Sequence, residues 1–162
     1  MCGEPLVVVA VCTYNGRNRI QRLIESLKKI DYPNFKIVIV DNNSSDGTFE
    51  FVNRQKELTV LIEERQGLSY ARNRAIDWCD GSVDYLAFLD DDEEVDTDWI
   101  KRMLEVFFTD RKIVVVGGPY IPVYEVKKPN WMINDFFAYR DDFKGIEIAN
   151  YTNIVGGNFM VD

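Results

Sequence analysis

The chain has 162 residues, 46% of them hydrophobic and 28% charged, which supports one globular domain with a substantial core. It contains no histidine, and 19 lysines and arginines against 27 aspartates and glutamates give a formal net charge of −8 at pH 7. These numbers exclude every histidine-based active site, including Ser/His/Asp triads and HExxH zinc sites, and they argue against a nucleic-acid partner.

The first part of the chain alternates between strand and helix patterns. Residues 6–13 (LVVVAVCT) form a nearly continuous β-branched run, which is typical of a strand buried on both faces. Apolar residues at steps of three and four then predict an amphipathic helix over residues 17–30. A second strand is expected at residues 35–40, and the Asn- and Ser-rich turn after it can cap a short helix that ends at Val52.

The same alternation continues to residue 118. We expect strands at residues 59–62, 85–89 and 113–116, and helices at residues 68–78 and 99–108. This order predicts a mostly parallel, doubly wound α/β sheet of Rossmann-like topology, with helices on both faces. After Gly118 the pattern is less regular, and we expect a helix at residues 131–139 and a final strand at residues 154–161.

The three cysteines, Cys2, Cys12 and Cys79, are widely spaced and form no CxxC pair, so neither a disulfide framework nor a zinc knuckle fits them. We interpret Cys12 and Cys79 as small buried hydrophobes in a reducing compartment. The N-terminus lacks the pattern of a secretory signal, and no apolar stretch approaches the roughly 20 residues that span a bilayer. The expected location is the cytoplasm, including the cytoplasmic face of the membrane.

Polar residues follow three of the predicted strands. They are Thr13-Tyr14-Asn15, Asp41-Asn42-Asn43-Ser44-Ser45-Asp46 and Asp90-Asp91-Asp92-Glu93-Glu94. In open parallel sheets, ligands bind in the crevice beyond the carboxyl ends of the strands, so these clusters predict a binding site. The alternative for the second cluster is an ordinary Asx turn that caps a helix.

The acidic run from Asp90 to Glu94 directly follows the apolar segment YLAFL, so its first acids lie at the end of a buried strand. Neighbouring carboxylates repel one another unless a cation or bound protons relieve the repulsion. Oxygen ligands without histidine or cysteine suit Mg²⁺ or Mn²⁺, and Mg²⁺ commonly uses one or two carboxylates together with substrate phosphates. A solvated charged turn is the alternative interpretation.

The sequence lacks the motifs of several known classes of nucleotide-binding protein. The chain has no G-x-x-x-x-G-K-[ST] sequence, which excludes a P-loop nucleotidase, and no G-x-G-x-x-G follows the first strand. A phosphoacceptor receiver domain also gathers aspartates at strand ends. Here, however, the acids follow the second and fourth strands, and no lysine ends the strand at residues 113–116.

Four short segments occur in order along the chain: Cys12-Thr13-Tyr14-Asn15, Asp41-Asn42-Asn43-Ser44-Ser45-Asp46-Gly47-Thr48, Gly67…Ala71-Arg72-Asn73 and Phe88-Leu89-Asp90-Asp91-Asp92. Together they resemble the N-terminal nucleotide-binding part of the family 2 glycosyltransferases of the GT-A fold. The later segment Gly156-Gly157-Asn158 is similar to an acceptor-side segment of that family. The resemblance covers essentially the whole chain.

The resemblance implies a nucleoside-diphosphate sugar donor, with UDP as the expected nucleotide, and a sugar or other hydroxyl acceptor, as in polysaccharide biosynthesis. It also implies inversion at the anomeric carbon and a need for Mg²⁺ or Mn²⁺. The implied donor-binding residues are Thr13 and Asp41 for the base and ribose, Tyr14 and Asn15 for the pocket, Arg72 for the nucleotide or its phosphates, and Asp90 and Asp91 for ribose or donor sugar. Asp92 is the implied metal ligand.

The general base of the family is expected beyond the Gly-Asn segment, and this sequence ends at Asp162. We therefore expect a single GT-A domain over residues 1–162 that is truncated at its C-terminus. Residues 1–118 would form its nucleotide-binding part and residues 119–162 the start of its acceptor-side part. Asp141, Asp142 and Glu147 are possible substitutes for the base, although a solvated loop suits them as well. An uncovered sheet edge would favour self-association.

Two other functions are compatible with the same residues. One is a nucleotide-sugar binding module, or an inactive fragment, that binds a donor without transferring the sugar. The other is a sugar-1-phosphate nucleotidylyltransferase, which the absence of a Gly-rich basic loop after the first strand disfavours. An acceptor platform could form from Trp131, Phe136, Phe137 and Tyr139, for which burial against the sheet is the alternative.

Overall fold

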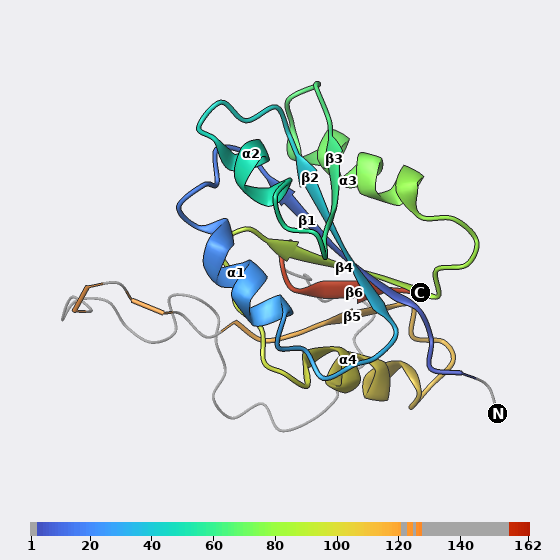
Figure 1. Cartoon of the computed structure of the whole chain (residues 1–162). Helices are drawn as coiled ribbons and strands as arrows, with labels where there is room; N and C mark the ends of the chain where they lie inside the picture. The colour runs from blue at the N-terminus through green and yellow to red at the C-terminus, as the bar shows by residue number, and fades with distance from the viewer. Residues whose placement is uncertain (1–2, 121–122, 125, 128–155) are drawn as a thin grey trace.

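The computed structural model describes residues 3–120, 123–124, 126–127 and 156–162 (Figure 1). The elements, in chain order, are β1 (Val7–Thr13), α1 (Ile20–Leu27), β2 (Phe35–Asp41), α2 (Thr48–Val52), β3 (Thr59–Ile62), α3 (Leu68–Trp78), β4 (Tyr85–Asp90), α4 (Trp99–Phe107), β5 (Val115–Gly117) and β6 (Phe159–Val161). None of the helices in the described ranges is long and apolar enough to cross a membrane.

The strands form one sheet in the order β3-β2-β1-β4-β6-β5. The pairs β1–β2, β1–β4 and β2–β3 are parallel. Strand β6 is antiparallel to both of its neighbours and separates β4 from β5, although it is the last element of the chain. The sheet is therefore mostly parallel, as the alternation of strands and helices predicts, with one antiparallel strand inserted near its edge.

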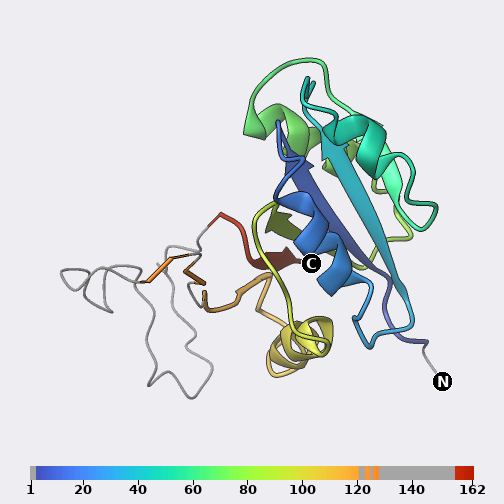
Figure 2. The same ribbon diagram turned by 60° about the vertical axis from the view of Figure 1, so that its left-hand side comes forward.

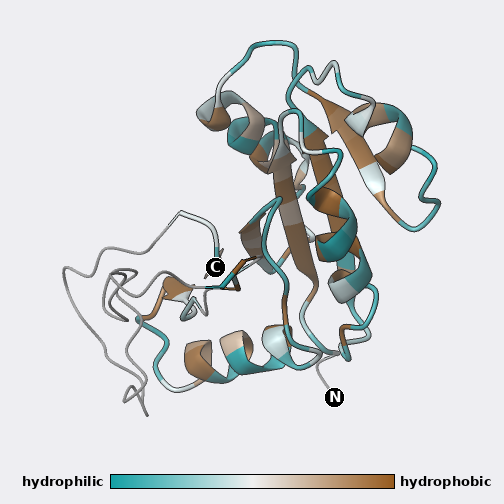
Figure 3. Cartoon of the chain, turned by 90° about the vertical axis from the view of Figure 1, so that its left-hand side faces the viewer, coloured by the Kyte–Doolittle hydropathy of each residue, from teal (hydrophilic) through white to brown (hydrophobic). Residues whose placement is uncertain are grey.

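Helices cover both faces of this sheet, because the residues of each buried strand alternate between two cores. Val7, Val9 and Val11 of β1 pack in the same cluster as the apolar residues of α1 and α4. Val8 and Ala10 pack on the other side, in the cluster that contains the small residues of α3. Figures 1 and 2 show α1 and α3 on opposite sides of the central strands. In Figure 3 those strands are hydrophobic along most of their length, as expected of strands covered on both faces.

Helix α1 is shorter than the predicted range of residues 17–30. Residues 17–19 form turns instead, in which the carbonyl of Gly16 accepts hydrogen bonds from the N–H groups of Arg19 and Ile20. At the other end, the N–H of Asp31 donates to the carbonyl of Thr97 at 2.7 Å, so the chain has left the helix axis. Tertiary hydrogen bonds of this kind are not visible in an apolar repeat, which is why the repeat overestimates the helix.

Some predictions fall outside the described residues. They are the helix at residues 131–139 with its aromatic side chains, the acids Asp141, Asp142 and Glu147, and the first two residues of the final strand.

The two described cysteines, Cys12 and Cys79, are free and half-buried beside the cluster that contains α3. Burial raises the pKa of the Cys12 thiol to about 12, and burial also raises the pKa of Cys79. Both behave as small apolar side chains.

Candidate functional site

The polar edge of the sheet forms where β1, β2 and β4 end side by side. Thr13 is in register with Asp41, and Cys12 is in register with Asp90, so the chain segments that follow these strands leave the same edge. The N–H of Asn42 donates to the carbonyl of Thr13 at 2.8 Å, which extends the pairing past the last residue of β2. The parallel sheet thus brings together residues that are up to 78 positions apart in the sequence.

Asp41 is the most enclosed acid of this edge, at 1% exposure. One carboxylate oxygen, Oδ1, accepts a hydrogen bond from the N–H of Ser44 at 2.9 Å, as in an Asx turn. The other oxygen, Oδ2, is buried and has no hydrogen-bond partner among the residues that the structure describes. A buried carboxylate oxygen without a partner is costly, and such a group is often explained by a ligand or an ion that binds there.

Two loops at this edge hold each other in place through asparagine residues. Asn15 and Asn43 both adopt positive φ angles, 49° and 64°, a conformation that asparagine tolerates better than most residues. The Asn15 N–H donates to Ser44 Oγ at 3.0 Å, and the Asn15 side-chain oxygen accepts from the Ser45 N–H at 2.9 Å. Tyr14, between these loops and β1, is 49% exposed. Its aromatic ring is therefore accessible from solvent at the edge of the candidate site.

Asp91 is buried in a charged cluster with Thr13 and Arg19. The Thr13 hydroxyl donates to Asp91 Oδ2 at 2.6 Å. The Arg19 guanidinium donates to both carboxylate oxygens, from Nε at 3.0 Å and from Nη2 at 3.1 Å. Gly16 lies against this pair so closely that an added Cβ would overlap the Thr13 hydroxyl and the Asp91 carboxylate. Thr13 and Asp91 were both predicted to contact the donor, and in this structure their polar atoms bind each other.

Asp90 and Arg72 lie together at the end of β4. The Arg72 Nη2 and the Asp90 Oδ1 are 3.7 Å apart, and the Arg72 guanidinium also donates to the carbonyl of Gly156. The same guanidinium lies over the rings of Phe88 and Phe159, at 5.7 Å from each centroid. Burial raises the pKa of Asp90, an effect that the charge of Arg72 opposes. Arg72 therefore connects the acidic turn after β4, which runs from Asp90 to Glu93, to the segment before β6.

Asp92 is exposed, unlike its neighbours. Within the described ranges, the structure contains no group of three or more cysteine, aspartate or glutamate side chains arranged to hold a metal ion. The oxygen donors of Asp90 and Asp92 nevertheless have the chemistry that Mg²⁺ or Mn²⁺ prefers, with substrate phosphates completing the coordination. The residues present fit a divalent ion that binds together with its substrate, and Asp92 as the ligand stays a prediction.

Glu93 differs from the other acids of the turn because its carboxylate contacts both the backbone of the turn and the side chain of Tyr120. Its Oε2 accepts a hydrogen bond from the N–H of Asp90 at 3.1 Å, and its Oε1 lies beside the Tyr120 hydroxyl, where both groups pack against Gly157. Burial raises the pKa of Glu93 to about 7. Although a carboxyl group with such a pKa suits acid–base catalysis, these contacts enclose it, and the hydrogen bonds indicate a structural role.

Two of these residues, Arg19 and Tyr120, escaped the sequence analysis as site members, and Glu93 was named there only as part of the acidic run. Glu93 belongs to the acidic run that the sequence displays, so its position was visible but its separate role was not. Arg19 and Tyr120 have no local signal, because their partners are 72 and 38 positions away. Only the sheet topology brings them to this edge.

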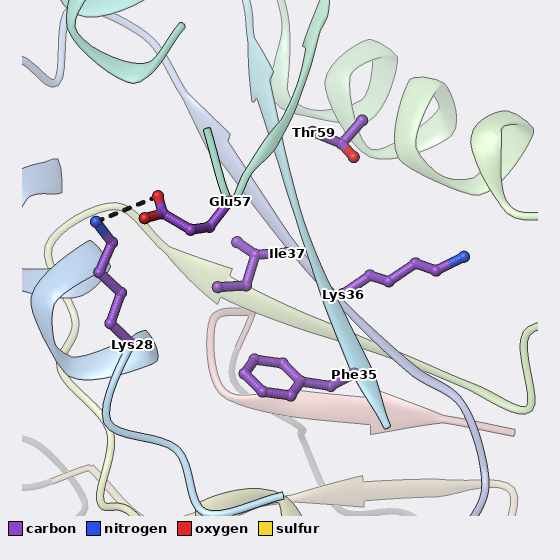
Figure 4. A pocket seen from close by; sticks show the side chains of 6 residues that line it. All are labelled: Lys28, Phe35, Lys36, Ile37, Glu57 and Thr59. Atoms are coloured by element: carbon purple, nitrogen blue, oxygen red, sulfur yellow. Dashed lines mark ion pairs between the residues drawn. The ribbon is translucent and has the colours of Figure 1, made fainter. Parts of the chain in front are cut away.

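A separate hollow of about 450 Å³ lies at the opposite ends of the strands, lined by Lys28, Phe35, Lys36, Ile37, Glu57 and Thr59 (Figure 4). Phe35 and Thr59 are the first residues of β2 and β3, whereas the acidic cluster follows the last residues of the strands. An ion pair of 3.5 Å between Lys28 and Glu57 lies at this hollow. The hollow shares no residue with the candidate site, and its volume alone does not indicate a ligand.

The chain is similar in sequence to a known protein family and to several characterised proteins. Residues 8–161 match the family model described as glycosyl transferase family 2. Glycosyltransferase AglE of Haloferax volcanii is 36% identical over 121 residues, which is 70% of this chain and 39% of that protein. The chain thus spans about two fifths of the length of this curated relative.

Two solved structures share the fold at 26% identity. One is the mannosyltransferase PcManGT from Pyrobaculum calidifontis in complex with GDP-Man and Mn²⁺, with a TM-score of 0.62 over 72% of this chain and 36% of that chain. The other is S. aureus TarS 1-349 in complex with UDP, with a TM-score of 0.61 over 76% of this chain and 40% of that chain. These neighbours are GT-A glycosyltransferases, which confirms the fold predicted from the sequence.

Proposed function

The chain belongs to glycosyl transferase family 2, and from this membership we propose that it binds a nucleoside-diphosphate sugar and transfers the sugar to a hydroxyl acceptor. The proposed donor is a UDP-sugar, and the proposed transfer inverts the anomeric carbon. The observation that most supports donor binding is the buried Oδ2 of Asp41, which lies at the polar edge of the sheet and has no hydrogen-bond partner among the described residues. We also propose a cytoplasmic location, consistent with the free cysteines Cys12 and Cys79.

The nucleoside is proposed to bind along the ends of β1 and β2. Asp41 Oδ2 would accept a hydrogen bond from the base or ribose, which removes the cost of leaving that oxygen unpaired. Tyr14 and Asn15 would form the wall of the pocket, because the Asn15 loop is already fixed by its bonds to Ser44 and Ser45. Thr13 would contribute through its backbone and its packing, since its hydroxyl donates to Asp91.

The diphosphate is proposed to bind at the acidic turn after β4. Breaking the bond between the anomeric carbon and the diphosphate leaves negative charge on the leaving group. A divalent ion held by Asp92 and the phosphates would stabilise that charge as it develops. Asp90 would contact the ribose or donor sugar, and Arg72, with 25% of its side chain exposed, would hold Asp90 in position. The acceptor hydroxyl also needs a general base, which the family resemblance places after the segment of residues 156–158.

Calorimetric titration with UDP-, GDP- and dTDP-sugars, in Mn²⁺ and in EDTA, tests this proposal. We expect UDP-sugars to bind in Mn²⁺ and to bind much more weakly in EDTA. Asp92→Asn should remove the difference between the two conditions because it removes the charged metal ligand. Asp77→Asn on α3, which changes an exposed acid outside the candidate site, should keep it. Equal donor affinity in Mn²⁺ and in EDTA for the unchanged chain would contradict metal-dependent binding.

A further inference from the structure

Three segments distant in the sequence meet at the Tyr120 hydroxyl. This hydroxyl accepts hydrogen bonds from the N–H of Gly157 at 2.9 Å and from the N–H of Asn158 at 2.5 Å. The Glu93 carboxylate lies beside this hydroxyl, because a Cβ added at Gly157 would overlap Glu93 Oε1 and would lie 2.6 Å from the Tyr120 oxygen, and this carboxylate can accept the hydroxyl proton. Since a hydroxyl has one proton and two lone pairs, two accepted bonds and one donated bond to the carboxylate use its full capacity.

The Glu93 carboxylate links Tyr120 to the acidic turn. Its Oε2 accepts the N–H of Asp90, and the N–H of Glu93 in turn donates to the carbonyl of Asp90 at 3.3 Å. The turn from Asp90 to Glu93 is therefore closed by a backbone bond and by a side-chain bond. Asp92, the proposed metal ligand, lies inside this turn, so the conformation of the turn decides where its carboxylate points.

Further contacts hold the segment of residues 156–158 against its neighbours. The indole N–H of Trp99 donates to Asn158 Oδ1 at 2.9 Å, and the N–H of Gly118 donates to the carbonyl of Asn158 at 3.0 Å. At Gly157, an added Cβ would overlap the Glu93 carboxylate and would lie 2.6 Å from the Tyr120 hydroxyl. The absence of a side chain at this residue is what allows the three segments to approach so closely.

We propose that Tyr120 is a positioning residue, whose hydroxyl couples the segment of residues 156–158 to the acidic turn through Glu93 and so fixes the Asp92 carboxylate for metal-dependent donor binding. This inference rests on the proposed function for its consequence at Asp92. The coupling itself rests on the hydrogen bonds of Glu93 and Tyr120 to the backbone and on the packing of both side chains against Gly157. The residue neither touches the donor nor takes part in the chemistry.

Tyr120→Phe tests the coupling because it removes only the hydroxyl. Tyr32→Phe is the matched control, since the Tyr32 hydroxyl also donates to a protein oxygen, the carbonyl of Pro5 at 2.7 Å, and is part of the hydrophobic core away from the acidic turn. Amide hydrogen exchange by NMR reports the coupling without any ligand. We expect Tyr120→Phe to speed exchange at Gly157, Asn158 and also Asp90, whose amide bonds to Glu93. Tyr32→Phe should leave these three amides unchanged.

Donor binding reports the consequence. One lost hydrogen bond of ordinary strength corresponds to about a threefold to tenfold change in an equilibrium constant. We expect a loss of this size in the affinity for a UDP-sugar in Mn²⁺, little change in EDTA, and no change for Tyr32→Phe in either condition.

The outcomes separate the two proposals. Unchanged exchange at Asp90 in Tyr120→Phe would overturn the coupling, whether or not the chain binds a donor. Faster exchange at Asp90 with undiminished affinity in Mn²⁺ would overturn the positioning role. If the unchanged chain binds no nucleotide sugar, the proposed function and the consequence at Asp92 fail, while exchange at Asp90 still decides the coupling.

Discussion

Asp41 is the residue whose surroundings most clearly indicate a ligand. Its Oδ1 accepts a hydrogen bond from the Ser44 N–H, and its buried Oδ2 has no hydrogen-bond partner in the described part of the chain. We expect Asp41→Asn to weaken UDP binding by about tenfold or more, because a hydrogen bond to a charged acceptor contributes about 1.5–3 kcal/mol. Isothermal titration calorimetry measures this loss.

The same substitution should leave the fold intact. An asparagine can still accept the Ser44 N–H through its side-chain oxygen, so the turn after β2 is retained. Thermal unfolding of Asp41→Asn should therefore stay close to that of the unchanged chain. Equal UDP affinity in both folded proteins would reduce Asp41 to a residue that only forms the turn.

The turn after β3 depends on a charge that should make stability pH-dependent. The Glu63 carboxylate accepts hydrogen bonds from the Arg65 side chain, with the Nε atom at 2.9 Å, and from the Arg65 N–H at 2.9 Å. These contacts lower the pKa of Glu63 from 4.5 to about 2. A carboxyl group with a lowered folded-state pKa stabilises the protein above its unfolded pKa, and this stabilisation is lost as pH falls through the folded pKa.

We expect Glu63→Gln to lower the free energy of unfolding at neutral pH. The difference from the unchanged chain should shrink as pH falls from about 4.5 towards 2, because Glu63 then becomes protonated in both states. Urea unfolding at a series of pH values measures it. A difference that stays constant down to pH 2 would show that the charge of Glu63 does not stabilise the turn.

The segment before β6 is packed against its neighbours at Gly157. We expect Gly157→Ala to lower the free energy of unfolding by about 1–3 kcal/mol, as overpacking of a tight site commonly does. Gly81→Ala is the matched control, because an added Cβ there meets nothing within 4 Å and Gly81 has no positive φ angle. That change should be neutral or stabilise by about 0.4–1 kcal/mol. Equal effects of the two changes in urea unfolding would contradict the close packing at Gly157.

At the scale of the whole molecule, β6 makes the sheet continuous between β4 and β5. Met160 is fully buried and lies in register with Ala87 on one side and Val116 on the other. We expect Met160→Ala to lower the free energy of unfolding by about 2–5 kcal/mol, since a buried methionine leaves a cavity in the core. Urea denaturation monitored by circular dichroism measures the change.

Val114→Ala provides the comparison for Met160, because Val114 is 61% exposed beside the same edge of the sheet. It should change the stability by no more than about 0.5 kcal/mol. A small loss for Met160→Ala, similar to that of Val114→Ala, would mean that β6 is dispensable for the fold.

The alternation of strands and helices, the mostly parallel sheet and the polar cluster at one edge can all be predicted from the amino-acid sequence. These features depend on local periodicity and on the rule that parallel strands present their carboxyl ends together, so neighbouring residues are enough to predict them. The positions of Thr13, Asp41 and Asp90 at the ends of β1, β2 and β4 follow from the same reasoning.

The pairing of the polar groups, in contrast, is visible only in the folded chain. Thr13 and Asp91 bind each other and Arg19, Arg72 connects Asp90 to Gly156, and Tyr120 connects Glu93 to Asn158. The insertion of β6 between β4 and β5 was equally hidden, because an antiparallel strand far along the chain has no local signal for its neighbours. Periodicity reports which face of an element is buried, whereas long-range hydrogen bonds depend on side-chain positions that the assembled sheet creates.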